Sequence, residues 1–364
     1  MNASFSMPSP DARCAWQVRG LQTDRSWVIE LDDADRADLL GALRAGRMPS
    51  KALLDYRRSD FAFGRALAPL KQAFEQAQHG LGIALIKGLP REGVSAEEFE
   101  LLTWAIGLHF GVARPQDKAS RYLNQVRDVG VDYRSPTGRG YSSKAELDFH
   151  IDGADLVALS CYNQAPIGGD SMATSSTAVF HRLRSERPDL AEALMQPYPW
   201  SRQGEQPPGE LPFSMQPIYA VQGDQVFCNW NRNRLNNALK LDGVAPLSAL
   251  QREAVEYLDA LVRSESFMFT MRLEAGDLQL LNNHCVLHSR TEFQDHPEPE
   301  RKRTLYRLWL APPDGDTLPQ SWKVLYRAVR RGTVRGGITG QHHDQARQDF
   351  EARQAAALGM GLQD

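Results

Sequence analysis

The sequence contains few cysteines, and none of them forms a motif that binds zinc or exchanges thiols. Four cysteines occur among 364 residues. No two of them are separated by just two residues, so neither a zinc knuckle nor a thioredoxin-like site has support. We therefore expect free thiols and a reducing, cytoplasmic environment.

Long apolar runs and a surplus of positive charge are also missing. No stretch approaches the roughly 18 apolar residues that a membrane-spanning helix needs, and the first residues lack the pattern of a secretory signal. The 42 basic and 45 acidic residues give a formal net charge of −3. Because nucleic acids and anionic membranes favour basic proteins, we expect neither as a partner and expect a small-molecule substrate instead.

The first third of the chain carries mainly helical patterns. Residues 35–46 and 64–79 have apolar side chains at helical spacing. Ser95 and Glu98 form a capping box that opens a further helix. Residues 82–87 have the composition of a short buried strand.

From about residue 147 onward, strand-like segments alternate with turns. The expected strands are 147–152, 156–163, 216–221, 225–230, 266–273, 278–288 and 303–311. The expected helices between them are 175–183, 188–195 and 246–262. Many short strands with inserted helices favour an α+β fold whose core is a double-stranded β-helix, of the jelly-roll or cupin-like kind, with flanking and inserted helices.

We expect a single catalytic domain that spans residues 1–364. Within it, residues 1–80 would form an N-terminal extension of helices and a strand, and residues 81–315 the jelly-roll core. Residues 316–364 would form a C-terminal extension, whose polar end is either a terminal helix or disordered.

Three residues have the types and the spacing of a metal site. His150 and Asp152 are two residues apart, so on a strand both side chains would point to one face. With the distant His288 they make the two-histidine, one-carboxylate set of non-haem iron oxygenases. Either histidine alone would more often be a hydrogen-bonded strand residue, so the assignment needs a further element.

That element is the segment RTLYRLWLA, which begins at Arg303. Arg303, Leu305, Arg307 and Trp309 share one parity, and two arginines on an apolar face are costly unless they meet anions. A guanidinium matches a carboxylate with two parallel hydrogen bonds. A dicarboxylate that binds the metal at one end and an arginine at the other, such as 2-oxoglutarate, fits this pattern. A solvent-facing strand edge is the alternative.

His284 has the same strand parity as His288, but four strand residues span roughly 13 Å. Both histidines therefore cannot bind one iron if the strand is regular. A hydrogen-bonded or exposed role is expected for His284, and Cys285 should face the core.

Three segments together resemble the TauD/TfdA group of iron(II)/2-oxoglutarate dioxygenases, with a clavaminate synthase-like core. They are ELDFHIDGADLVALSCYNQAPIGGDS, AGDLQLLNNHCVLHSRTEF and ERKRTLYRLWLAP. The resemblance runs from about residue 80 to residue 315. It implies a non-haem iron enzyme that uses 2-oxoglutarate and O2, releases succinate and carbon dioxide, and hydroxylates an unactivated C–H bond. Relatives of this kind are often oligomers, so a homo-oligomer is open.

The resemblance also assigns roles to individual residues. His150, Asp152 and His288 match the iron ligands. Arg303 and Ser171 match the residues that bind the distal carboxylate of 2-oxoglutarate, and Arg307 matches a second arginine. Either Arg303 or Arg307 would be the main anchor. Because the carboxylate ligand Asp152 is present, halogenation is not expected.

Substrate residues are predicted from loops and strands near the metal motif. Arg139 and Tyr141 precede it in a Gly-containing loop, Asn124 and Gln125 come from an upstream segment, and Asp155 follows it. Each has an ordinary structural alternative, such as a turn or an exposed polar position. Residues 201–212 are a candidate lid. The arginines suggest a small polar substrate with a carboxylate, such as an amino acid or a derivative.

Other functions are compatible with the same residues. The same iron centre could catalyse desaturation, epoxidation or cyclisation in natural-product biosynthesis, because these reactions diverge only after hydrogen abstraction. A zinc hydrolase or a non-catalytic ligand-binding barrel would leave the arginine segment without a purpose.

Overall fold

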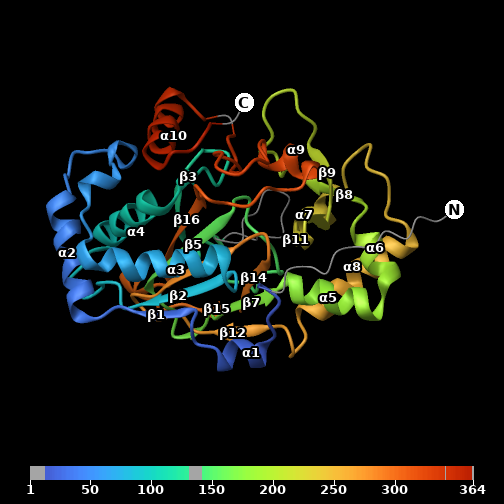
Figure 1. Cartoon of the computed structure of the whole chain (residues 1–364), viewed down its shortest axis with the longest axis horizontal. Coiled ribbons are helices and arrows are strands. Elements are labelled where there is room, and N and C mark those ends of the chain that lie inside the picture. Colours follow the sequence, from blue (N-terminus) through green and yellow to red (C-terminus); the bar gives the residue numbers. More distant parts are fainter. Residues whose placement is uncertain (1–12, 131–141, 341, 363–364) are drawn as a thin grey trace.

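The computed structural model describes residues 13–130, 142–340 and 342–362, which form a mixture of helices and strands (Figure 1). The helices of these residues are α1 (Val18–Thr23), α2 (Asp33–Gly46), α3 (Leu67–His79), α4 (Ala96–Phe110), α5 (Ser176–Glu186), α6 (Pro188–Leu194), α7 (Arg232–Ala238), α8 (Ala249–Val262), α9 (Lys323–Tyr326) and α10 (Gln345–Leu358). Among the described residues, no helix combines the length and apolar character that crossing a bilayer requires.

The strands belong to one large sheet, one three-stranded sheet and several pairs. They are β1 (Val28–Glu30), β2 (Ile83–Lys87), β3 (Val112–Arg114), β4 (Leu123–Val126), β5 (Leu156–Asn163), β6 (Ile167–Gly168), β7 (Ser171–Ser175), β8 (Pro197–Ser201), β9 (Phe213–Pro217), β10 (Tyr219–Gln222), β11 (Gln225–Cys228), β12 (Phe269–Met271), β13 (Leu278–Asn282), β14 (Val286–Arg290), β15 (Phe293–Gln294) and β16 (Thr304–Ala311).

The large sheet has the order β1-β2-β13-β5-β16-β3, and β4 also pairs with β16. Its two faces are covered differently, because alternate residues of a strand point to opposite sides. On one face, Leu308 and Leu310 join an apolar cluster with α3 and α4, which lie along this sheet in Figure 1. On the other face, Leu305 and Trp309 join a cluster that also contains Ala173 of β7.

The second sheet has the order β12-β7-β14. It shares the apolar cluster of Leu305 and Trp309 with the large sheet, so the two sheets pack face to face. Helices α5, α6 and α8 form a separate group beside this sheet (Figure 1). The two-sheet core with inserted helices agrees with the mixed architecture that the sequence predicted.

Most helices and strands begin and end close to the predicted positions. The predicted helix 35–46 corresponds to α2, and 64–79 to a 3-10 turn followed by α3. The predicted capping box is confirmed: the Ser95 side chain accepts from the Glu98 backbone, and the Glu98 side chain accepts from the Ser95 backbone. The polar C-terminal segment forms helix α10.

Two predicted strands near the metal motif are wrong. Residues 147–152 form no strand; His150 makes only isolated bridges, to Asn231 and His288. The predicted strand 278–288 is two strands in different sheets, β13 and β14, joined by a tight turn. Tertiary pairing overrides local pattern here, because each strand finds its partner in a different layer.

Helix α10 is fixed to the core through a buried glutamate. Glu351 lies 2.8 Å from the guanidinium of Arg114 and accepts hydrogen bonds from Tyr122 at 2.6 Å and from His343 at 3.1 Å. Burial alone would raise the pKa of Glu351, but Arg114 and the hydrogen bonds lower it to about 2.

We expect this group to make the stability of the protein depend on acid. Because the folded pKa of Glu351 is depressed, its stabilisation is complete above about pH 4.5, the ordinary glutamate value, and is lost as the pH falls towards about 2. Glu351→Gln should lower the free energy of unfolding by about 3 kcal/mol at neutral pH. Thermal unfolding against pH checks this: an unchanged acid profile in the variant would contradict it.

Candidate metal centre

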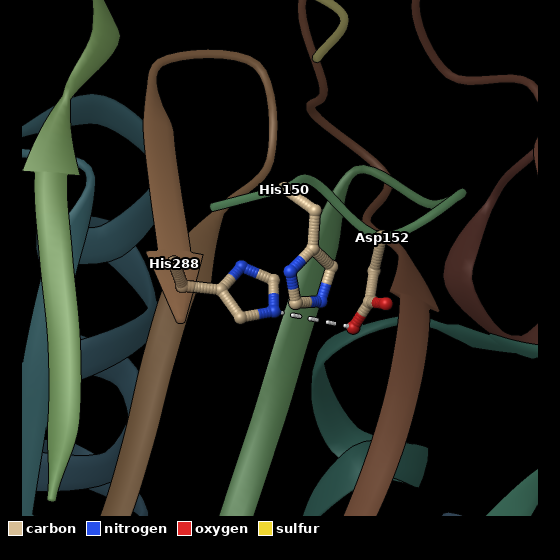
Figure 2. A group of neighbouring side chains, drawn as sticks. All are labelled: His150, Asp152 and His288. Carbon is tan, nitrogen blue, oxygen red and sulfur yellow. Dashed lines mark ion pairs between the residues drawn. The ribbon is translucent and has the colours of Figure 1, made fainter. Parts of the chain in front are cut away.

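His150, Asp152 and His288 converge on one point, although they come from two distant segments. One ligand atom from each lies within 4.8 Å of the others. The two imidazole rings are 4.4 Å apart, and Nε2 of His288 lies 3.7 Å from Oδ2 of Asp152. Figure 2 shows the three side chains pointing toward one another, with His288 projecting from β14.

The backbone of the two histidines is paired directly. The His150 N–H donates to the His288 carbonyl at 3.0 Å, and the His288 N–H donates back at 2.9 Å. This is a hydrogen-bonded antiparallel pair, in which opposite side chains stand side by side. The two histidines therefore meet because their backbones pair with each other. The strand alternation predicted for His150 and Asp152 is not the cause.

The side-chain amide of Asn283 helps to hold the turn that carries Asp152. Oδ1 of Asn283 accepts from the Asp152 N–H at 3.0 Å, and its Nδ2 donates to the Ala154 carbonyl at 2.9 Å. The Asn283 N–H donates to the Asp155 carbonyl at 2.9 Å. Asn283 lies in the turn before β14, so it links the two ligand-bearing segments.

Asn283→Ala should weaken metal binding without removing any ligand. Loss of a hydrogen bond that orients a metal ligand lowers metal affinity by about 10- to 100-fold. We therefore expect the affinity for iron(II) to decrease by about 10- to 100-fold. Anaerobic titration with Fe(II) measures the effect. The control is Asn282→Ala, which removes the neighbouring amide at the end of β13; that amide contacts Gln78 and His284 instead. Equal losses in the two variants would refute the positioning role.

The protonation states of the three residues suit a cation. Nδ1 of His150 contacts the Asp148 carbonyl at 2.8 Å, so its proton is on Nδ1 and Nε2 faces the site. Burial lowers the pKa of His150, and burial together with His150 lowers the pKa of His288 to about 3. Both imidazoles are therefore neutral at pH 7, as metal ligation requires.

Asp152 is held as a carboxylate by a buried arginine. Burial alone would raise the pKa of Asp152, but Arg307 and the two histidines outweigh burial, so its pKa lies below the ordinary value. Nη1 of Arg307 donates to both carboxylate oxygens, at 3.2 and 3.4 Å, while its Nε donates to Gln116 at 2.8 Å.

The predicted face of the arginine segment is the wall of a cavity. Arg303, Leu305, Arg307 and Trp309 all line a cavity of about 210 Å³ that also contains the three metal-site residues. From Leu305 onward, β16 pairs with β5 and, up to Leu308, with β4, which keeps the alternation; the register against β5 shifts between Thr304 and Leu305, and Arg303 directly precedes the strand. The parity prediction is thus confirmed, and the arginines belong to the same site as the triad.

Arg303 is buried with one edge of its guanidinium unused. Nε donates to Gln164 at 3.0 Å and Nη2 to the Gly169 carbonyl at 3.3 Å. Nη1 is buried and has no hydrogen-bond partner in the described part of the chain. Burial lowers the pKa of Arg303 to about 10, so the group is still a cation at pH 7.

The surroundings of Arg303 leave room for an oxyanion. Gly169 has φ +73°, and a Cβ there would lie 2.8 Å from Nε of Arg303, so glycine is required. Ser171 donates to Gln279 at 2.9 Å, and Nε2 of Gln279 is a second buried donor without a partner among the described residues. All three polar side chains line the cavity. Unused donors on two of them fit a carboxylate there.

Several predicted substrate residues lie elsewhere. Arg139 and Tyr141 are outside the described residues. Asn124 is buried, contacts Asp117 at 3.3 Å, and does not line the cavity. Gln125 is exposed and does not line it either. Asn124 pairs with Arg307 and Gln125 with Tyr306 across β4 and β16, and neither side chain lines the cavity, so the structure does not bring these two residues to the metal site.

Asp155 and His284 form a buried structural cluster outside the cavity. Asp155 accepts two hydrogen bonds from Nε of Arg335, at 3.0 and 3.1 Å, and contacts Nε2 of His284 at 2.8 Å. The His284 ring packs against Trp322 and Tyr326. Arg335 and His284 therefore already engage the carboxylate of Asp155, which does not line the cavity, so the structure lends no support to the substrate role predicted for it. His284 is the hydrogen-bonded histidine that the sequence favoured.

Amide side chains that the sequence did not single out orient the predicted residues. They are Gln116, Gln164, Gln279 and Asn283. Only Asn283 had a signal, as part of the Asn-Asn pair in the second motif. The candidate lid also contributes, because Ser201, Arg202, Gln203, Glu205, Gln206 and Pro207 line the cavity.

A two-histidine, one-carboxylate group beside a cavity between two sheets defines the class of non-haem iron oxygenases. The family model described as "Taurine catabolism dioxygenase TauD, TfdA family" matches residues 51–309. The chain belongs to the TauD/TfdA family. It is a dioxygenase that uses Fe(II), 2-oxoglutarate and O2, and the His150, Asp152 and His288 group fits the iron site.

Relatives and solved structures agree with this family. FR-33289 synthase of Streptomyces rubellomurinus (strain ATCC 31215) is 29% identical over 316 residues, covering 85% of this chain and 92% of its own. Uridine-5'-phosphate dioxygenase of an Amycolatopsis species is 30% identical over 219 residues, 56% of this chain and 78% of its own. Asparagine oxygenase with Fe(II), 3-hydroxyasparagine and succinate has a TM-score of 0.59 at 18% identity, covering 78% of this chain and 93% of its own.

Proposed function

We propose that this enzyme hydroxylates an unactivated C–H bond of a small polar substrate, such as an amino acid or a derivative, and releases succinate and carbon dioxide. The observation that carries the proposal is the pairing of two features in one cavity. One is the convergent His150, Asp152 and His288 group. The other is the buried, unused Nη1 of Arg303.

Each feature has a distinct role in the proposal. His150, Asp152 and His288 hold the iron, and Arg303 with Ser171 holds the distal carboxylate of 2-oxoglutarate. Arg303 is the main anchor, because Arg307 is already engaged by Asp152 and Gln116. When bound, iron, 2-oxoglutarate and O2 together supply the oxidant for the C–H bond. The cavity wall excludes water from that oxidant.

The substrate class is supported by the cavity and by the compounds bound in similar structures. Besides the asparagine oxygenase, the oxygenase OrfP has been solved with (3S)-hydroxy-L-Arg, at a TM-score of 0.60 and 14% identity. Both structures contain a hydroxylated amino acid. Several polar and basic side chains line the cavity of this chain as well, which favours a polar ligand.

One relative supports a biosynthetic role. It is named FR-33289 synthase, so a step in natural-product biosynthesis is a second candidate for this chain, with desaturation, epoxidation or cyclisation as the outcomes other than hydroxylation. The mass of the product separates these outcomes, since hydroxylation adds one oxygen atom and desaturation removes two hydrogens.

The proposal also covers the domain organisation and the cellular compartment. We infer one catalytic domain over the whole chain, with a double-stranded β-helix built from the two facing sheets. All four cysteines are free thiols, which is consistent with a reducing cytoplasm.

The test begins with anaerobic addition of Fe(II) and 2-oxoglutarate to the purified protein. A weak visible absorption band, from charge transfer between the two, should appear. Amino acids and their derivatives are then screened for 2-oxoglutarate turnover in air. Absence of the band, with tightly retained zinc instead, would overturn the iron assignment; turnover with only uncharged hydrophobic compounds would overturn the substrate class.

A further inference from the structure

Arg234 is a cation of the cavity that the iron and 2-oxoglutarate site does not use. It lies in α7 and lines the cavity together with the metal-site residues. Its side chain is only 22% exposed. A buried guanidinium is costly unless an anion or strong acceptors satisfy it, so its partners decide its purpose.

The other arginines of the cavity are all hydrogen-bonded. Arg303 binds Gln164, Arg307 binds Asp152, and Arg290 binds the Thr291 carbonyl. The remaining two, Arg202 and Arg327, both bind Glu210.

Arg234 differs from these five. Within the described residues its guanidinium makes no hydrogen bond, and its ion pair with Oε2 of Glu205 is 3.7 Å long. That distance is too long for a hydrogen bond. Glu205 balances the charge from one side, and the donors that it does not take are available to a ligand in the cavity.

The backbone places Arg234 close to the metal-site residues. Asn231 makes an isolated bridge with His150, and the Trp230 carbonyl accepts from the Ile151 N–H at 2.9 Å. The Asn231 side chain then accepts from the Arg234 N–H at 3.0 Å and starts α7. Arg234 thus lies three residues after Asn231, which is paired with the predicted iron ligand His150.

We propose that Arg234 is the substrate-anion receptor: it binds an oxyanion group of the substrate, a carboxylate, sulfonate or phosphoryl group, beside the C–H bond that is attacked. This deepens the proposed function and rests on it. A guanidinium suits this role because it presents paired donors to two oxygens of one group. Neutral analogues would leave the guanidinium donors that Glu205 does not take without an acceptor and are rejected for that reason.

The test uses small anions, because it then does not depend on knowing the substrate. Acetate, methanesulfonate and methylphosphonate are titrated into the anaerobic complex with Fe(II) and 2-oxoglutarate, with acetamide as the neutral control. The shift of the visible band reports binding near iron. Quenching of tryptophan fluorescence in the metal-free protein reports it independently, since Trp200 and Trp309 line the cavity.

The wild-type protein should bind one of the three anions at least about tenfold more tightly than acetamide. Arg234→Gln should lose at least about tenfold of that affinity and leave the visible band itself unchanged, whereas Arg234→Lys should retain part of it. The matched control is Arg232→Gln, in the same helix, whose side chain pairs with Glu256 and Asp259 outside the cavity.

Two results overturn the inference: equal anion affinity in Arg234→Gln and the wild type, or a wild type that does not prefer any anion to acetamide. Which of the three anions binds best identifies the oxyanion. Failure of the visible band to form, with anion binding still seen by fluorescence, would instead reject the iron assignment and leave Arg234 as an anion receptor.

Discussion

Replacement of His288 by alanine should abolish iron-dependent turnover of 2-oxoglutarate. His288 supplies one of three convergent ligand atoms, and its neutral imidazole cannot be replaced by a neighbour, because His284 is bound to Asp155. A bound metal contributes several kcal/mol to the reaction it promotes, so turnover should fall by more than about a thousandfold. Succinate release, measured with saturating Fe(II), checks this.

The control for this variant is His296→Ala, which removes a histidine outside the cavity. That variant should keep wild-type turnover. His288 is buried beside the apolar core, so thermal unfolding of the metal-free variant must also be compared with that of the wild type. A folded His288→Ala protein that still releases succinate at the wild-type rate would remove this residue from the iron site.

Replacement of Arg303 by glutamine should raise the KM for 2-oxoglutarate by roughly a hundredfold, because a charge-assisted pair in a buried site is lost. The kcat at saturating 2-oxoglutarate should fall much less, since Arg303 does not touch the metal-site residues. Arg303→Lys keeps the charge but not the two parallel donors, so it should recover only part of the loss. Steady-state kinetics over a wide range of 2-oxoglutarate concentrations measure both constants.

Arg301→Gln is the matched control, because Arg301 lies two residues away with a side chain that is 59% exposed and paired with Glu298. Its KM should be that of the wild type. The opposite result would contradict this assignment. If Arg303→Gln left the KM for 2-oxoglutarate unchanged and Arg307→Gln raised it roughly a hundredfold, Arg307 would be the main anchor.

The sequence was most informative where a regular strand carries the site. The shared face of Leu305, Arg307 and Trp309 could be predicted because β16 is paired on both sides from Leu305 onward, which keeps the alternation. Arg303 directly precedes the strand and lines the same cavity, although the register against β5 shifts between Thr304 and Leu305. The same parity placed Arg303 and Arg307 on one face with apolar side chains. Charged residues on an apolar face conflict with the local pattern, and such a conflict is expected at a functional site.

Elsewhere the local pattern was a poor guide, for physical reasons. The alternation of His150 and Asp152 suggested a strand, yet the geometry comes from pairing with His288 and from Asn283, 131 residues away from Asp152. Hydrogen bonds over such distances leave no periodic trace in the sequence. Gln125 was misplaced for a related reason, because the register of β4 against β16 determines which side chains face the cavity.

The direct backbone pairing of His150 and His288 also bears on how the protein acquires its metal. The two histidines are held by their own two backbone hydrogen bonds, and Asp152 is held by Asn283, so the fold itself arranges the ligands. In zinc fingers, by contrast, the ion drives folding and chelators unfold the protein. Here iron loading and removal become exchange reactions of a folded protein, so a chelator should leave an inactive but intact apoenzyme that regains activity when Fe(II) is returned.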